Sequence, residues 1–162
     1  MLIFMGESSD TAKSNMDEFE HAAALVLARL YGAFPSPIIL EPKQLESGIS
    51  LDVAIVYADT IDFLAREGFI VHGHAVRHAH RDRIVAEHFL DVVLTSKGLT
   101  ILNAVPKALT IQGESEAEDA AKKPIGKRLV DAIRKGAPNV AGTLAKTALT
   151  EGAKWLAGYY GP

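Results

Sequence analysis

The sequence contains no cysteine among its 162 residues, which excludes disulfide bonds and thiolate metal ligands and fits a reducing compartment. Long hydrophobic runs are also missing. The N-terminal stretch MLIFM is apolar for only five residues, lacks a positively charged flank and leads directly into the polar GESSDTAKS. It is therefore neither a signal peptide nor a membrane span, and we expect a soluble, cytoplasmic protein.

Signals of catalysis are scarce as well. Gly126, Gly136 and Gly142 are scattered instead of forming a phosphate-binding loop, and no serine stands in a nucleophile-elbow context. Asp59 and Asp62 would share one exposed helix face, whereas acid–base catalysis needs carboxyl groups in a pocket. We expect neither an enzymatic activity nor a bound cofactor.

The composition indicates one modest domain with an appended segment. Hydrophobic residues make up 48% of the chain and charged residues 23%, which is enough to build a core. Residues 1–105 contain 8 Lys and Arg against 14 Asp and Glu, whereas residues 106–162 contain 9 Lys and Arg against 6 Asp and Glu. The net charge of the first part is therefore negative and that of the second part is positive. The predicted parts are an extension over 1–14, a domain over 15–106, a polar linker over 107–123 and a C-terminal segment over 124–162.

The N-terminal half begins with a predicted helix. Ser14 and Asp17 have the spacing of a capping box, and the apolar stripe that follows consists of Phe19, Ala23, Val26 and Leu30. The opposite face is predicted to be solvated; it carries Asp17, Glu18, His21, Ala28 and Arg29. Gly32 and Pro35 end the helix, and residues 37–40 predict a short edge strand that could pair with a later one.

A second helix, two strands and a third helix are predicted between residues 51 and 106. The second helix has an apolar stripe of Val53, Val56, Tyr57, Ile61 and Leu64. Gly68 suits the left-handed position after a helix, and residues 69–71 favour a strand. The alternation of residues 90–94 predicts another strand. Thr95 or Ser96 then caps a helix that buries Leu99, Leu102 and Val105 before Pro106 ends it.

The stretches REGFI and VVLTSKGLTIL resemble the end of the recognition helix and the strand-to-helix turn of winged-helix proteins, a group that includes many small bacterial transcriptional regulators. The resemblance covers roughly residues 15–105. It implies an α+β, mainly α, winged-helix domain with a small antiparallel β-sheet, here followed by a C-terminal amphipathic helical segment. Residues 32–51 carry proline and glycine breaks where the family has a compact second helix, so we expect that helix to be short, displaced or absent.

The resemblance implies a nucleic-acid contact, for which the two relevant segments give opposite signals. The exposed face of the second helix carries Asp52, Ile55, Asp59, Asp62 and Arg66, which is the wrong sign for a polyanion. The segment between the strands would form the wing, and arginine is well suited to phosphate and minor-groove contacts. The candidate nucleic-acid-binding residues are Arg66, Arg77, His78, His80, Arg81 and Arg83.

The histidines of the same segment permit a metal hypothesis. His72 and His74 would project from one strand, and His78 and His80 from the returning chain. The spacing matches no tight zinc signature, and the flanking arginines would repel a cation. A solvated basic turn is the alternative, and no metal ligand is assigned.

The C-terminal segment predicts an amphipathic helix interrupted around Gly136 and Pro138. The small residues Ala141, Ala145, Ala148 and Gly152 make one edge nearly flat, so the helix needs a partner surface. That surface could be its own domain, a second protomer or a membrane face, while Lys146, Glu151 and Lys154 exclude a simple span. The residues assigned to an oligomer or partner interface are Leu129, Ile133, Val140, Leu144, Ala148 and Trp155.

Two functions of different class follow. The first is a winged-helix DNA-binding regulator, dimeric through its C-terminal helix, that contacts duplex DNA through a basic wing. The second is a non-enzymatic winged-helix interaction module that binds protein or a membrane surface through its acidic helix face or C-terminal helix. The resemblance favours the first function and the charge pattern favours the second, because a fold alone does not fix a function.

Overall fold

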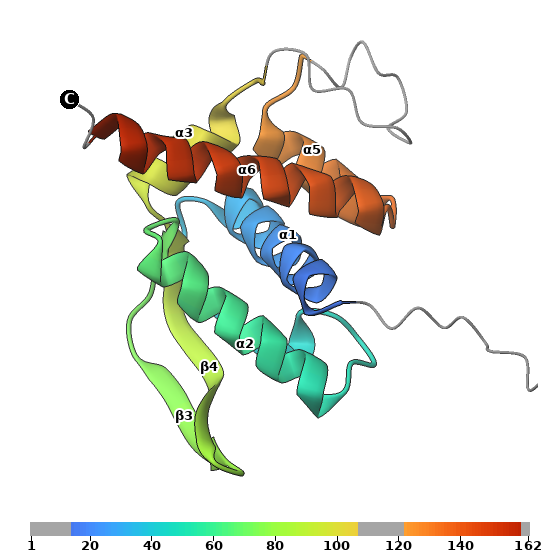
Figure 1. The fold of residues 1–162 in the computed structure, drawn as a ribbon, viewed down its shortest axis with the longest axis vertical. Coiled ribbons are helices and arrows are strands. Elements are labelled where there is room, and N and C mark those ends of the chain that lie inside the picture. The colour runs from blue at the N-terminus through green and yellow to red at the C-terminus, as the bar shows by residue number, and fades with distance from the viewer. Residues whose placement is uncertain (1–13, 107–121, 160–162) are drawn as a thin grey trace, which may run out of the picture.

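The computed structural model describes residues 14–106 and 122–159. The predicted extension over 1–14 and the predicted linker over 107–123 therefore lie almost entirely outside the described residues. The fold is α+β and mainly α, with a small antiparallel sheet (Figure 1). In chain order the elements are α1 (Asn15–Ala33), β1 (Ile38–Leu40), η1 (Pro42–Gln44), α2 (Leu51–Arg66), β2 (Ile70–Val71), β3 (Ala75–His80), β4 (Arg83–Leu94), α3 (Ser96–Asn103), α5 (Ile125–Arg134) and α6 (Pro138–Tyr159).

Helix α1 lies at the centre of the molecule. The predicted capping box is confirmed: the Ser14 hydroxyl accepts from the Asp17 N–H, and the Asp17 carboxylate accepts from the Ser14 N–H, both at 3.2 Å. Three consecutive residues, 22–24, are fully buried, which one covered face of a helix cannot explain. The reason is that α2, α5 and α6 all contact α1 (Figure 1). Ala28, predicted on a solvated face, is buried for the same reason.

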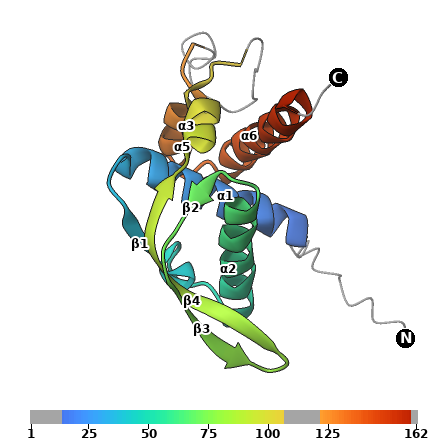
Figure 2. The same cartoon turned by 90° about the vertical axis from the view of Figure 1, so that its left-hand side faces the viewer.

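Strand β4 organises the sheet. On one side it pairs with β1, with Ile38 opposite Val92 and Leu40 opposite Phe89, so the predicted short strand is confirmed. On the other side β4 pairs with β2 and with β3. Strands β3 and β4 form a long hairpin that projects from the helical part (Figure 2). We refer to residues 75–88 as the hairpin.

The predicted two-stranded ribbon is confirmed, but its strands contain residues that were assigned to the exposed turn. The prediction joined residues 69–71 to residues 90–94 through one long histidine-rich turn, whereas the turn consists of Arg81 and Asp82 alone. Arg81 has a positive φ of 53°, as tight hairpins require. The ribbon is longer because Ala86 and Phe89 are buried and extend its inner face toward the turn.

The junction of α2, β2 and α3 is closed by local hydrogen bonds. Gly68 has a φ of 79°, the left-handed conformation predicted after the helix. The Thr95 hydroxyl caps α3 by accepting from the Gly98 N–H at 3.0 Å, and Lys97 Nζ donates to the Glu67 carbonyl at 2.6 Å. The helix ends at Asn103, earlier than predicted, so Val105 is 46% exposed and not buried.

The region between β1 and α2 contains no α-helix. Only η1, a single 3₁₀ turn that begins at Pro42, lies in the region for which a short, displaced or absent helix was predicted. The expectation of a short or absent helix is confirmed. The chain therefore leaves the sheet directly at the end of β1.

The C-terminal helices pack on their own domain, the first of the three surfaces that the sequence left open. The predicted break occurs at Gly136, which has a φ of 65°, and α6 starts at Pro138. The flat edge of α6 is covered, since Ala141, Ala145 and Ala148 are fully buried and Gly152 lies against the Phe69 ring. Helices α5 and α6 contact both α1 and α3.

This packing corrects the interface assignment of the C-terminal segment. Leu129, Leu144 and Ala148 have no exposed surface, and Val140 is only 5% exposed. Ile133 is partly buried against the same core. These side chains cannot form a dimer contact without unpacking the chain. Trp155, which is 46% exposed, is the remaining candidate. Among the helices of the described ranges, none has the length and apolar character needed to cross a bilayer.

Candidate interaction surface of the hairpin and helix α2

Two ion pairs join the hairpin to helix α2. The guanidinium of Arg77 donates from Nη1 and Nη2 to the two carboxylate oxygens of Asp62, at 3.1 and 2.8 Å. Arg83 Nη2 donates to Asp59 Oδ1 at 2.7 Å. Asp59 and Asp62 are three residues apart on the face of α2 that was predicted to be exposed. The positive charges of Arg77 and Arg83 on the hairpin and the negative charges of Asp62 and Asp59 on α2 therefore neutralise each other.

The environment of Arg77 holds this arginine charged and in place. Its guanidinium carbon lies 6.0 Å from the centroid of the Phe89 ring, within the range of a cation–π contact. The hydrogen bonds to Asp62 raise the pKa of Arg77. A bidentate arginine–carboxylate pair has a more defined geometry than a single contact between point charges. The pair thus adds one contact of defined geometry between the hairpin and α2.

The other candidate nucleic-acid-binding residues do not form one positive surface with this pair. Arg81 is exposed in the hairpin turn and Arg66 is exposed in the last turn of α2. His78 Nε2 lies 3.2 Å from Glu87 Oε2, so a carboxylate accompanies this histidine too. His80 is half-buried on the same strand. Of the six predicted residues, Arg81 and Arg66 are therefore the two arginines that are exposed and make no carboxylate contact within the described residues.

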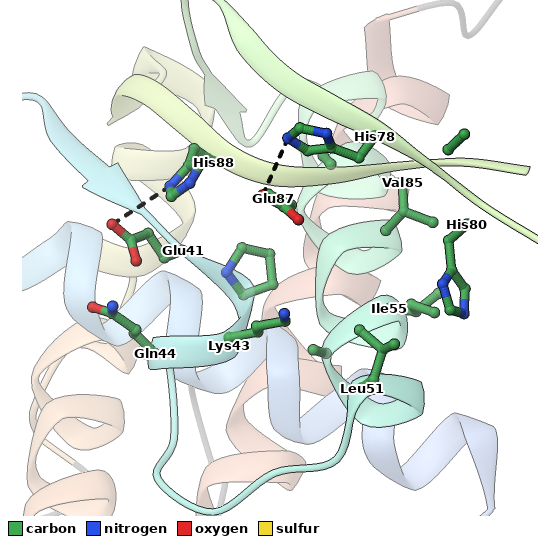
Figure 3. A pocket seen from close by; sticks show the side chains of 14 residues that line it. Glu41, Lys43, Gln44, Leu51, Ile55, His78, His80, Val85, Glu87 and His88 are labelled. Atoms are coloured by element: carbon green, nitrogen blue, oxygen red, sulfur yellow. Dashed lines mark ion pairs between the residues drawn. The ribbon is translucent and has the colours of Figure 1, made fainter.

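A hollow of about 260 Å³ lies between the hairpin, η1 and α2 (Figure 3). We call this space the hollow. Its apolar wall includes Leu51 and Ile55 of α2 and Val85 of β4, which point into it (Figure 3). Lys43 of η1 lies on the opposite side. The sequence did not reveal the hollow, because its walls come from separate segments of the chain, residues 41–44 and 51–55 on one side and residues 78–88 on the other.

Histidines and glutamates form the polar rim of the hollow. His88 Nδ1 lies 3.5 Å from Glu41 Oε1, in addition to the contact between His78 and Glu87. His80 Nε2 is buried and makes no hydrogen bond within the described part of the chain. The metal hypothesis assumed that His78 and His80 lie on the returning strand, but both lie on β3. In the described residues no three histidine, aspartate or glutamate side chains are placed to hold a metal ion.

A second polar cluster, which the sequence did not predict, connects α1 to α2. Glu46 Oε2 accepts from the Tyr57 hydroxyl at 2.7 Å and lies 3.0 Å from His21 Nε2. Burial, followed by the hydrogen bond to Glu46, raises the pKa of Tyr57. His21, predicted on a solvated face, has a side chain that is only 15% exposed. The one available signal was Tyr57 within an apolar stripe, because a buried tyrosine hydroxyl needs a polar partner.

The raised pKa of Tyr57 predicts a pH dependence of stability. Tyrosine ionises near pH 10 in the unfolded chain and at a higher pH in the folded chain, so Tyr57 stabilises the fold below pH 10 and loses this contribution as the pH rises further. The free energy of unfolding should fall above pH 10 by up to about 1.4 kcal/mol per pH unit from this group. Urea unfolding at pH 8 to 11 measures it.

Tyr57→Phe is the matched variant, because it removes the ionisable hydroxyl and keeps the ring. The remaining tyrosines and lysines titrate in both proteins, so the difference between the two slopes isolates Tyr57. Parallel curves above pH 10 would show that the Tyr57 hydroxyl is as accessible to ionisation in the folded chain as in the unfolded one.

Comparison of this chain with protein-family models, with curated proteins and with solved structures gives no match. The interpretation of the surface therefore rests on its geometry and charge.

Proposed function

We propose that this chain is a non-enzymatic winged-helix module that binds another protein through the hairpin and the adjacent face of α2. The order of α1, β1, η1, α2 and the hairpin supports a winged-helix arrangement, as does the position of β4 between β1 and β3. In this arrangement α2 takes the place of the recognition helix. The hairpin takes the place of the wing.

The single observation that carries the proposal is the pairing of the hairpin arginines with carboxylates of α2. Affinity for duplex DNA is built largely from phosphates neutralised by Lys and Arg. Here Arg77 and Arg83 are bound to Asp62 and Asp59, and a phosphate would have to displace them. The helix that would enter the major groove also brings Asp52. This surface therefore offers little unpaired positive charge to a polyanion.

Exposed aliphatic side chains on the same surface favour a protein partner. Leu51 at the start of α2 is 46% exposed and Ile84 near the hairpin turn is 61% exposed. Leu51 lines the hollow, which adds partly buried apolar wall, and Ile84 directly precedes the lining residue Val85 on β4. Apolar residues surrounded by paired charges are typical of protein–protein interfaces with a polar rim.

Duplex DNA binding is the second candidate. The observation that favours it is the projecting hairpin with Arg81 exposed at its turn, a position from which wings contact the phosphate backbone or minor groove. This candidate needs the paired arginines to be released.

A mobility shift with random duplex DNA over a range of salt concentrations distinguishes the two. At about 0.15 M salt the native chain should bind more weakly than about 10⁻⁴ M, the weak end of non-specific DNA binding. The double variant Asp59→Asn, Asp62→Asn frees Arg77 and Arg83 and should bind DNA more tightly. Its affinity should fall with salt more steeply than that of the native chain, because two more phosphate contacts become available.

The control is Glu20→Gln with Glu151→Gln, which changes the net charge equally but on α1 and α6. A similar gain in this control would mean that net charge and not the released arginines determines binding. Micromolar binding of DNA by the native chain, abolished by Arg77→Ala with Arg81→Ala, would replace the proposed function with the second candidate.

A further inference from the structure

One edge of β4 is open over half its length. Strand β4 has 12 residues, and β3 pairs with it from Arg83 to Phe89. On the opposite side β1 covers only Phe89 to Val92. In the described ranges no strand pairs with the other edge of residues 83–88. Backbone donors and acceptors on that edge are available to another chain.

The edge is open because the chain turns away at Pro42. Proline has no N–H to donate to a sheet, and η1 begins with this residue. Beyond Leu40 the chain passes below the hairpin without pairing, so η1 and β4 stand on two sides of the hollow (Figure 3). A third side is α2, through Leu51 and Ile55, and β3 lines the rest through His78, Ala79 and His80. A groove between a strand edge and a helix is a common setting for strand addition.

We propose that an extended peptide segment of the partner protein adds to β4 along residues 83–88, antiparallel to it and in line with β1. This inference rests on the proposed function and names how the partner binds. Backbone hydrogen bonds to the open edge hold the segment. Alternate side chains enter the hollow, since successive residues of a strand point to opposite faces.

The walls of the hollow define the chemistry of that segment. Leu51, Ile55 and Val85 present aliphatic surface, which fits aliphatic side chains such as valine. Lys43 stands exposed at the entrance, whereas the rim carboxylates Glu41 and Glu87 already lie beside histidines. A carboxylate on the segment would complement Lys43. The expected segment therefore combines aliphatic side chains that enter the hollow with an acidic side chain that can reach Lys43.

A single extended chain fits this place better than a second copy of the protein. The hollow is bounded by η1 and α2 as well as by β4. A strand that enters it has η1 along its other edge, so that edge cannot remain paired within a sheet of its own protein. The open edge is short, six residues, which matches a peptide segment. A few backbone hydrogen bonds and the burial of two or three aliphatic side chains give weak, reversible binding.

The test uses a capped octapeptide of alternating valine and glutamate, titrated into the full-length ¹⁵N-labelled protein. We expect saturable shifts of the backbone amides of residues 83–88 and slower hydrogen exchange there. The same peptide N-methylated at alternate residues on its β4-facing edge should lose binding, because it cannot donate to the strand. A valine–lysine peptide should bind at least about tenfold more weakly, as expected for a loss of about 1.4 kcal/mol.

Ile55→Lys should also weaken binding at least about tenfold, because it places a charge in the apolar wall. Ile39→Lys is the matched control, since Ile39 is 58% exposed on β1 and does not line the hollow. It should bind as the native protein does. Circular dichroism confirms that both variants remain folded.

Equal binding of the N-methylated peptide would overturn strand addition, as would shifts confined to the outer edge of β3 or to α5. The same amide shifts caused by raising the protein concentration alone would assign the edge to a second copy. The DNA mobility shift distinguishes failure of strand addition from failure of the proposed function. If neither DNA nor peptide binds, only strand addition fails. If DNA binds at micromolar affinity, the proposed function fails.

Discussion

Replacing Leu144 by alanine is expected to lower the free energy of unfolding by about 3 kcal/mol and to leave the oligomeric state unchanged. Leu144 has no exposed surface and belongs to the core that α6 forms with α1 and α5. Truncation removes buried methyl groups and leaves a cavity, because a central helix contacted by three others cannot collapse freely into the space. Urea unfolding followed by circular dichroism measures the loss.

The competing expectation is a dimer formed through the same stripe. In that case the variant would dissociate in size-exclusion chromatography, and its stability would depend on protein concentration. Lys146→Ala serves as control, since Lys146 is exposed on the same helix two residues further on. It should change stability by less than about 0.5 kcal/mol. A large loss in the control would mean that truncating an exposed side chain of α6 is destabilising in itself, and the loss at Leu144 could not be assigned to core packing.

Gly98→Ala is expected to destabilise the fold by roughly 2 to 3 kcal/mol, as overpacking against an immobile group does. A Cβ at this position would lie 2.2 Å from the carbonyl oxygen of Phe69 and 3.1 Å from its carbonyl carbon. That carbonyl accepts from the Thr95 N–H at 3.0 Å, so it cannot move without breaking the junction of β2 and α3. Thermal and urea unfolding measure the effect.

Gly142→Ala is the matched control within α6. The nearest heavy atom that its Cβ would meet is Glu20 Cβ, at 4.0 Å. Alanine should therefore stabilise the protein by up to about 1 kcal/mol through helix propensity. Equal shifts of the same sign in the two variants would contradict the close approach at Gly98.

Local signals predicted the elements well. The capping residues Ser14 and Thr95 and the left-handed Gly68 act over three or four residues, and each lies where the sequence placed it. The small-residue edge of α6 correctly indicated a close contact. The sequence did not show which surface the edge contacts, because that choice depends on α1, more than a hundred residues earlier.

The candidate surface was less predictable because its contacts join distant residues. Asp62 and Arg77 are 15 residues apart, and Asp59 and Arg83 are 24 apart, so no periodicity relates them. The sequence correctly predicted that the exposed face of α2 is acidic and that the hairpin segment is basic. Their neutralisation follows from the length and angle of the hairpin, which depend on burial of Ala86 and Phe89. The signal in the sequence was the adjacency of two segments of opposite sign.

The position of α1 has a consequence for the order in which the chain is made. Its surface is covered by α2, which is synthesised soon after it, and by α5 and α6, which are synthesised after the hairpin. A nascent chain that has emerged only through the hairpin still presents the alanine-rich flank of α1 to the ribosome exit and to chaperones. A chain that stops before α6 would therefore leave part of the apolar surface of α1 exposed, and such surface promotes aggregation.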